Sequence, residues 1–280
     1  MNKSSFGSHF TVTTWGESHG KALGAVIDGC PAGLTLSEED IQKFLDRRKP
    51  GQSRYTTARK EGDLVEILSG VFEGKTTGTP ISLMVRNTDQ RSRDYGNIAY
   101  SYRPGHADYT FDAKYGFRDY RGGGRSSGRE TIGRVASGAV ASRLLASLGI
   151  SFCTYTKSIG PVSIKEYNPE EINNNAFYMP DADAAAKAGT YLEECMKNQD
   201  SAGGVIECRI SGVPAGLGNP VFEKLDAMLS QAVMSVGAVK AVEIGDGIQV
   251  AHMKGSEDND GFLIKDNVIT KTSNHAGGIM

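Results

Sequence analysis

Gly29-Cys30-Pro31-Ala32-Gly33-Leu34, near the start of the chain, is echoed by Gly212-Val213-Pro214-Ala215-Gly216-Leu217 in its last third. Each copy follows a strand-like run and precedes an amphipathic helical pattern. Val242-Glu243-Ile244 resembles Val65-Glu66-Ile67 at the corresponding later place. Chance could produce either match alone, but their shared order predicts a duplicated strand-turn-helix-strand unit. We therefore expect an α+β fold with internal pseudo-duplication, forming a single domain over residues 1–280.

The segments around the first copy carry local signals for further elements. Residues 9–14, 22–28, 64–72 and 80–85 have the pattern of strands, and a Gly/Thr-rich turn joins the last two. Ser37 and Asp40 resemble a capping box that begins a helix ending at Pro50-Gly51. In the clearest helix, apolar residues recur at helical spacing from Ile132 to Leu148, and Gly149 is placed to cap it.

Composition limits the classes of protein to which the chain can belong. Its 280 residues are 39% hydrophobic and carry a net charge of -2, which argues against a general nucleic-acid binder with its usual basic excess. The cysteines are scattered without a Cys-x-x-Cys pair, so we expect neither zinc nor disulfides, and a reducing, cytoplasmic setting. The sequence begins without a signal-peptide core and has no membrane-spanning apolar run.

Arginines are concentrated between residues 91 and 134, where Lys114 is the single lysine. They are Arg91, Arg93, Arg103, Arg118, Arg121, Arg125, Arg129 and Arg134. Arginine is preferred to lysine where a planar fork must hold a carboxylate or phosphate. Arg125, Ser126 and Ser127 fall at or just before a predicted helix N-terminus, which favours an anion. A solvated basic face is the alternative, but the neighbouring glycine loop, Gly122-Gly123-Gly124, favours a pocket for a small anion.

Two histidines lie in glycine-bearing turns of the sequence. His19 is part of Gly16-Glu17-Ser18-His19-Gly20, and His106 is part of Arg103-Pro104-Gly105-His106-Ala107-Asp108. Either could supply a proton near neutral pH, although a lone histidine is more often structural. The turn around His19 lacks the Gly-x-Ser-x-Gly pattern of a serine nucleophile. We therefore take both histidines as candidates for proton transfer beside the arginines.

These motifs, together with Asp46-Arg47-Arg48-Lys49-Pro50-Gly51 and Gly124-Arg125-Ser126-Ser127-Gly128-Arg129-Glu130, resemble the chorismate synthase family. The resemblance covers essentially the whole chain. It implies a lyase of the shikimate pathway that removes phosphate and a ring hydrogen from 5-enolpyruvylshikimate 3-phosphate, in an anti-1,4-elimination, to give chorismate. It also implies reduced FMN (FMNH2) used without net redox change, a β-α-β sandwich core and a homotetramer.

The resemblance also implies roles for individual residues. His19 would donate a proton beside the leaving phosphate, and His106 would stabilise the reduced flavin. Substrate-binding candidates are Arg47, Arg48, Arg103 and Arg129. FMN-binding candidates are Arg125, Ser126, Ser127, Gly237 and Ala238. A weaker implication places NADPH, as a reductant, at Arg48 and Arg54, and whether the chain reduces its own flavin stays open.

The sequence departs from the family pattern in three places. Gly128 stands where alanine is usual, Gly237 stands where asparagine is common, and the sequence stops at Met280 within a glycine-rich motif. We therefore expect a chain that lacks the family's C-terminal segment. One alternative is a catalytically impaired FMN- or anion-binding remnant of that enzyme. A second is RNA binding through tyrosines interleaved with the arginines, although those tyrosines fit a core or a subunit contact better.

Overall fold

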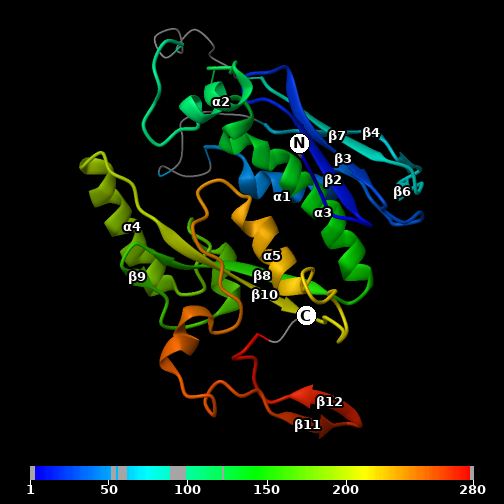
Figure 1. The fold of residues 1–280 in the computed structure, drawn as a ribbon, viewed down its shortest axis with the longest axis vertical. Coiled ribbons are helices and arrows are strands. Elements are labelled where there is room, and N and C mark those ends of the chain that lie inside the picture. The colour runs from blue at the N-terminus through cyan, green and yellow to red at the C-terminus, as the bar shows by residue number, and fades with distance from the viewer. Residues whose placement is uncertain (1–3, 52–54, 56–61, 89–98, 122, 278–280) are drawn as a thin grey trace. The chain divides into compact units, whose positions relative to one another are not determined.

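The computed structural model describes residues 4–51, 55, 62–88, 99–121 and 123–277 (Figure 1). The chain forms two compact units, residues 1–213 and residues 214–280. Each unit has its own secondary structure, so the two are described separately.

A five-stranded antiparallel sheet organises the first half of the larger unit. Its strands, in spatial order, are β1 (Ser5–Phe6), β2 (Thr11–Gly16), β3 (Ala22–Asp28), β7 (Ile81–Arg86) and β4 (Val65–Ser69). A small hairpin of β5 (Val71–Phe72) and β6 (Lys75–Thr76) lies in the connection between β4 and β7. Ile81, Leu83 and Val85 are buried while their neighbours along β7 are more exposed, as alternation on a sheet with one buried face requires.

Helices α1 (Glu38–Arg48) and α3 (Thr131–Ser147) cover one face of this sheet (Figure 1). Ser37 and Asp40 form the predicted capping box at the start of α1. Helix α3 crosses β3 closely, because a Cβ at Gly133 would lie 2.8 Å from the carbonyl oxygen of Gly24. The apolar core between the helices and the sheet includes Ile41, Leu45 and Ile132 from the helices.

A second, three-stranded sheet completes the larger unit. Its order is β10 (Gly204–Ser211), β8 (Ser151–Ile159) and β9 (Val162–Ser163), all antiparallel. The turn η4 (Pro169–Asn173) leads toward α4 (Ala182–Lys197), which buries Ala184, Ala185 and Ala188 around Met179. This is a smaller core, separate from the one under α1 and α3.

Short helices connect the first sheet to α3. They are α2 (Asp108–Tyr115), η2 (Gly124–Ser126) and η3 (Gly128–Glu130). Ser127 caps η3, because its side chain accepts a hydrogen bond from the backbone N–H of Arg129. The arginine- and glycine-rich segment therefore runs directly into the N-terminus of α3.

The smaller unit contains α5 (Leu225–Met234), η5 (Gly247–His252) and a hairpin of β11 (Phe262–Lys265) and β12 (Val268–Lys271). Asp260 ties its last segment down by accepting hydrogen bonds from Ser273 Oγ at 2.7 Å and from the backbone N–H of His275 at 2.8 Å. Among the described residues, no helix is both long enough and apolar enough to cross a membrane.

The first glycines of the two copies of the repeated motif, Gly29 and Gly212, have similar backbone conformations. Gly29 and Gly212 each follow a strand with a positive φ (85° and 78°), and a Cβ on either would collide with a carbonyl oxygen at about 2 Å, that of His9 (1.7 Å) or that of Gly149 (2.1 Å). Val65 to Ile67 lie in β4 as predicted. The strand predicted at Val242–Ile244 is wrong, because the adjoining backbone turns at Gly245 and Asp246 to bond His275.

Candidate active site

Two candidate arginines share one carboxylate inside the larger unit. Arg48, in the last turn of α1, places Nη1 2.8 Å from Asp63 Oδ2, and Arg129, in η3, places Nη2 3.0 Å from Asp63 Oδ1. The side chain of Asp63 is fully buried and that of Arg129 is 6% exposed. Two guanidinium groups therefore converge on one carboxylate that is shielded from water, where charge interactions are poorly screened.

Arg48 also joins the end of α1 to the start of α3. Its Nε donates to Thr131 Oγ1 at 3.1 Å, and its Nη2 donates to the carbonyl oxygen of Gly128 at 3.3 Å. The planar guanidinium therefore contacts three different groups, which fixes its orientation. Arg47, its neighbour, is directed elsewhere: its guanidinium carbon lies 4.7 Å from the centre of the Tyr178 ring.

Asn87 connects Arg129 to the turn that carries His19. Its Oδ1 accepts from Arg129 Nε at 3.1 Å and from Arg129 Nη2 at 2.9 Å. Its Nδ2 donates to the carbonyl oxygens of Glu17 at 3.1 Å and Gly20 at 2.8 Å. The structure therefore brings Arg48, Arg129 and the His19 turn into one hydrogen-bonded cluster.

His19 itself is buried, with 7% of its surface exposed, in the turn between β2 and β3. The turn is closed by Gly20 N–H donating to Glu17 O at 3.1 Å, and Ser18 N–H donates to Gly124 O in the glycine loop at 3.4 Å. Hydrogen bonds from Arg121, and to a smaller extent the charge of His19, hold the pKa of Asp119 below its ordinary value. His19 therefore lies within electrostatic reach of the loop that precedes η2.

Arg125 uses its guanidinium to hold that loop on the sheet. Its Nη2 donates to the carbonyl oxygen of Thr14 at 3.1 Å and to Thr14 Oγ1 at 2.7 Å, while its Nη1 donates to Gly16 O at 3.1 Å. Ser126 is exposed and its Oγ donates to Gly123 O at 2.7 Å. Ser127 is half-buried and caps η3. The two hydroxyls thus belong to a loop that the side chain of Arg125 anchors to β2.

Arg103 and His106 lie in the segment that leads into α2. Arg103 makes a two-pronged pair with Asp108, from Nε and Nη2, at 2.8 Å each. These hydrogen bonds hold the pKa of Asp108 far below its usual range. His106 is exposed, and its Nδ1 lies 3.0 Å from the carbonyl oxygen of Pro104. Since a carbonyl only accepts, Nδ1 carries the proton in the neutral ring and Nε2 is left as the acceptor.

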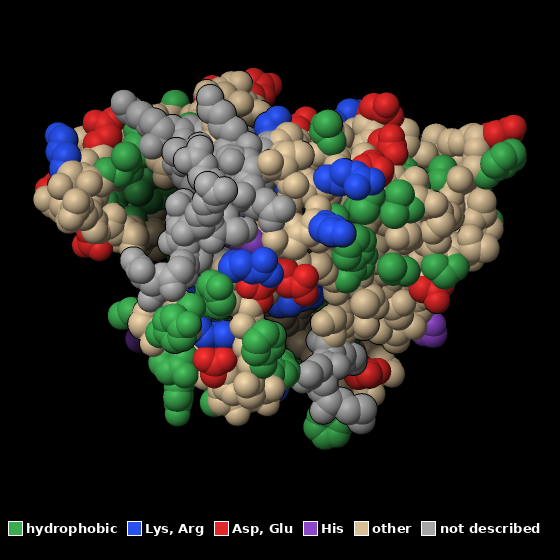
Figure 2. Space-filling view, turned by 90° about the horizontal axis from the view of Figure 1, so that it is seen from above, with side chains coloured by type: hydrophobic (Ala, Val, Ile, Leu, Met, Phe, Trp, Pro, Cys, Tyr) green, Lys and Arg blue, Asp and Glu red, His purple; other side chains and the backbone are tan. Residues whose placement is uncertain are grey.

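The segment of Arg103 meets the glycine loop, because a Cβ placed on Gly123 would lie 3.9 Å from Arg103 Nη2. On the face seen in Figure 2, Lys and Arg side chains are interspersed with Asp and Glu side chains and with apolar ones. Arginines between residues 99 and 134 form ion pairs with carboxylates, as Arg103 does with Asp108, Arg121 with Asp119 and Arg134 with Glu130. The arginine pocket stays a prediction.

Two further predicted residues belong to the smaller unit. Gly237 and Ala238 follow α5 in the smaller unit, where Ala238 has a positive φ of 69°. Within that unit nothing lies near a Cβ placed on Gly237, so the turn is open there. Arg54, together with Arg91 and Arg93, lies outside the described residues.

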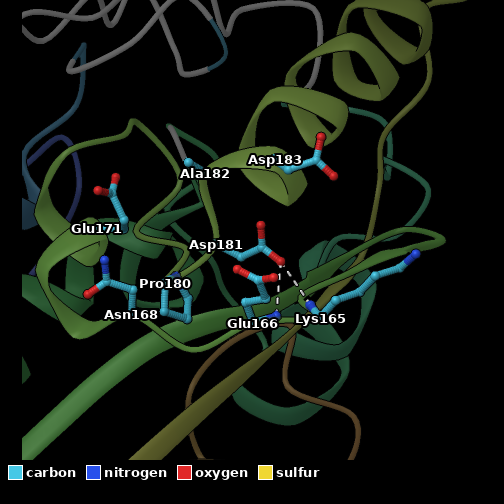
Figure 3. Close-up of a pocket in the computed structure, with 8 residues that line it drawn as sticks. All are labelled: Lys165, Glu166, Asn168, Glu171, Pro180, Asp181, Ala182 and Asp183. Atoms are coloured by element: carbon cyan, nitrogen blue, oxygen red, sulfur yellow. Dashed lines mark hydrogen bonds between the residues drawn. The ribbon is translucent and has the colours of Figure 1, made fainter.

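A separate pocket of about 430 Å³ lies between η4 and the start of α4 (Figure 3). It is lined by Lys165, Glu166, Asn168, Glu171, Pro180, Asp181, Ala182 and Asp183. Asp181 accepts from the backbone N–H groups of Lys165 at 2.9 Å and Glu166 at 3.2 Å. Four carboxylates and one lysine line this pocket, so it is unsuited to an anionic ligand. Within the described part of the chain, no group of three or more His, Cys, Asp or Glu could hold a metal ion.

Sequence reasoning missed Asp63 and Asn87, although both are central to the cluster. Asp63 lies two residues before β4 and Asn87 directly follows β7, so each is a polar residue close to the end of an apolar strand. That position was a usable signal, since the ends of adjacent antiparallel strands meet at one sheet edge. Their partners lie 66 and 42 residues away, at Arg129, and no local pattern reports such a distance.

Three comparisons with known proteins identify the same family. The sequence model of the family described as chorismate synthase matches residues 10–280. The chain is 65% identical to chorismate synthase from Agathobacter rectalis and 65% identical to that from Lachnoclostridium phytofermentans, in each case over 100% of this chain and 77% of the relative. A crystal structure of chorismate synthase superposes with a TM-score of 0.82 at 34% identity, covering 98% of this chain and 80% of that one.

Proposed function

Because the chain belongs to the chorismate synthase family, we propose roles in that reaction for the residues of the cluster around Asp63. The activity is that of chorismate synthase: a phosphate-eliminating lyase of the shikimate pathway that acts on 5-enolpyruvylshikimate 3-phosphate and depends on FMN. The fold is the mixed α+β fold of that family. The assignments that follow concern individual residues, the reductant and the assembly.

Arg47, Arg48, Arg103 and Arg129 bind the substrate in this proposal. The substrate carries one phosphate and two carboxylates, and arginine forks match such groups in geometry and charge. Support comes from the convergence of Arg48 and Arg129 on the buried carboxylate of Asp63. Arg103, locked on Asp108 beside the glycine loop, presents a guanidinium whose pose is already fixed. Arg47 is exposed and lies against Tyr178, and in this proposal it contacts the substrate from there.

His19 donates a proton to the leaving phosphate in this proposal. As the carbon–oxygen bond breaks, negative charge develops on the departing phosphate oxygen, and an imidazolium N–H can neutralise it. The buried position of His19 and the bond network from its turn to Arg129 through Asn87 support this role. A buried donor also keeps the proton away from water until the substrate arrives.

Residues of each unit, taken separately, are proposed to contact FMN. In the larger unit, Ser126 and Ser127 offer hydroxyls. In the smaller unit, Gly237 and Ala238 form a turn in which nothing lies within 4 Å of a Cβ placed on Gly237. When bound, reduced FMN supplies electron density to the reacting substrate. His106 would accept a hydrogen bond at Nε2 or, once protonated, stabilise a negative charge there. Arg125 contributes indirectly, since its own donors hold Thr14 and Gly16.

Four further features complete the proposal. NADPH as a reductant would use Arg48 and Arg54; within the structure, Arg48 contacts Asp63, Thr131 and Gly128. The matching glycines after β3 and β10 support an internal duplication of the β-α-β type. The assembly is a homotetramer, measurable by sedimentation equilibrium, and the protein works in the cytoplasm.

The observation that carries these assignments is the shared burial of Asp63 by Arg48 and Arg129, with Asn87 linking them to His19. The test is anaerobic chorismate formation from 5-enolpyruvylshikimate 3-phosphate with chemically reduced FMN. We expect turnover that falls by at least about 100-fold in His19→Ala and His106→Ala. Turnover that survives both substitutions would overturn the two histidine roles. FMN binding without any turnover would favour the alternative of an impaired FMN-binding remnant.

A further inference from the structure

Asn87 lies between two parts of the proposed site and is bonded to both. Besides its side-chain bonds, its backbone N–H donates to the carbonyl oxygen of Lys21 at 3.1 Å. Three bonds therefore tie Asn87 to the segment 17–21, and two more tie it to the guanidinium of Arg129. Asn87 is half-buried at the end of β7, so the rigid sheet holds it in place.

The chemistry of this position requires an amide. Carbonyl oxygens only accept hydrogen bonds and a guanidinium only donates them. The side chain between Glu17 O and Gly20 O on one side and Arg129 on the other must therefore donate in one direction and accept in the other. A carboxylate could serve Arg129 but not the turn, and an apolar side chain could serve neither.

We propose that Asn87 is a positioning residue that sets the His19 turn at a fixed place relative to the guanidinium of Arg129. The inference rests on the proposed roles of those two residues in proton donation and substrate binding. If Arg129 holds an acidic group of the substrate, the Asn87 amide determines where the His19 ring stands against the leaving phosphate. Groups outside direct contact with substrate act in this way when they fix the rotamers of those that touch it.

Asn87→Asp separates the two halves of this role. The new carboxylate still accepts from Arg129. Its second oxygen replaces Nδ2, which in the wild type lies 3.1 Å from the carbonyl oxygen of Glu17 and 2.8 Å from that of Gly20, so oxygen faces oxygen with no proton between them. Repulsion displaces the turn and His19 with it. Because a misplacement of about 1 Å can cost about 100-fold in rate, we expect a loss of that order in kcat, with a much smaller rise in KM.

The pH profile gives a readout that a merely structural role would not move. A carboxylate introduced beside the His19 turn favours the imidazolium, so the His19 pKa rises. The limb of the kcat profile that is absent in His19→Ala should shift to higher pH in Asn87→Asp. In Asn87→Ala, which adds no charge and removes both sets of bonds, kcat should fall and KM should rise together, without that upward shift.

Asn175 provides a matched control within the same unit. Its Nδ2 also donates to two carbonyl oxygens, those of Glu171 and Met179, at 2.8 Å each. Asn175→Asp therefore loses the same kind of bonds and gains the same charge away from His19. We expect it to lower the melting temperature while leaving kcat and its pH limb unchanged.

The outcomes separate the inference from the function on which it rests. Loss of turnover in His19→Ala, with wild-type kcat in both folded Asn87 variants, overturns the positioning role alone. A kcat for Asn87→Asp reduced no more than that of Asn175→Asp also overturns it. If His19→Ala retains wild-type turnover, the proton-donor role fails and the inference fails with it. A selective loss of kcat with the shifted limb in Asn87→Asp supports it.

Discussion

At the scale of single residues, the candidate site depends on how charges are paired. The arginines of the 91–134 segment and the two histidines were visible in the sequence because their number and their glycine neighbours are local properties. Their partners were not visible: Asp63 reaches Arg129 across 66 residues, and only the closed sheet brings the two together. The role of Arg125 was also hidden, since bonds to the carbonyl oxygens of Thr14 and Gly16 leave no pattern in a sequence.

Asp63→Asn tests the shared carboxylate. The substitution keeps the shape but removes the charge that faces Arg48 at 2.8 Å and Arg129 at 3.0 Å. The guanidinium groups of the buried Arg129 and the half-buried Arg48 then lose the charge that they share, so the free energy of unfolding in urea should fall by about 3 kcal/mol. Glu66→Gln is the control, because its pair with Arg86 is exposed and should contribute less than about 1 kcal/mol. Equal effects of the two substitutions would contradict a special role for Asp63.

At the scale of elements, helices with local signals were predicted well and pairings between distant strands were not. The capping box of α1 and the apolar spacing of α3 are written within a few turns of chain, and both helices are confirmed. The pairing of β8 with β10 joins segments about 50 residues apart, and helix α2 is short, with Asp108 its single buried residue. Neither leaves the periodicity on which sequence analysis depends.

Gly133→Ala tests the close crossing of α3 over β3. An added Cβ would meet the Gly24 carbonyl oxygen at 2.8 Å and Thr14 Cγ2 at 3.0 Å, so α3 must move away from the sheet. We expect a loss of about 1–3 kcal/mol in unfolding free energy, measured by urea denaturation, and weaker substrate binding, since η3, which carries Arg129, directly precedes this helix.

Gly138→Ala in the same helix is the matched control, because nothing lies within 4 Å of its Cβ position. Alanine there should stabilise the protein by about 0.5–1 kcal/mol through helix propensity alone. If both substitutions stabilised the protein, the crossing would be less tight than the distances indicate.

At the scale of the whole molecule, the chain forms two compact units, and the predicted single domain over residues 1–280 stays a prediction. The repeated Gly-x-Pro-Ala-Gly-Leu motif correctly located two strand-to-turn transitions, because positive φ is a property that glycine alone adopts easily. The second match, of Val242–Ile244 to Val65–Ile67, wrongly predicted a strand, because the backbone beside Ile244 binds His275 within the smaller unit instead. That contact depends on residues about 30 positions later.

The smaller unit should lose stability as pH rises. A hydrogen bond from His275 Nδ1 to Asp246 at 2.8 Å raises the pKa of His275 above its ordinary value. The stabilisation is therefore complete below the unfolded pKa of about 6.5 and is lost as pH rises through the higher folded pKa. Amide hydrogen exchange around residues 245–277 should show a larger difference between wild type and His275→Gln at pH 6 than at pH 8.

The cluster around Asp63 has a consequence for the order of events in biosynthesis. Its members come from the turn at residues 17–20, the end of α1, the segment just before β4, the residue just after β7, and η3. Arg129 is the last of these residues to be synthesised, so the pair of guanidinium groups around Asp63 is complete only after η3 has left the ribosome. Substrate that needs the complete cluster therefore binds only chains whose first sheet has already closed.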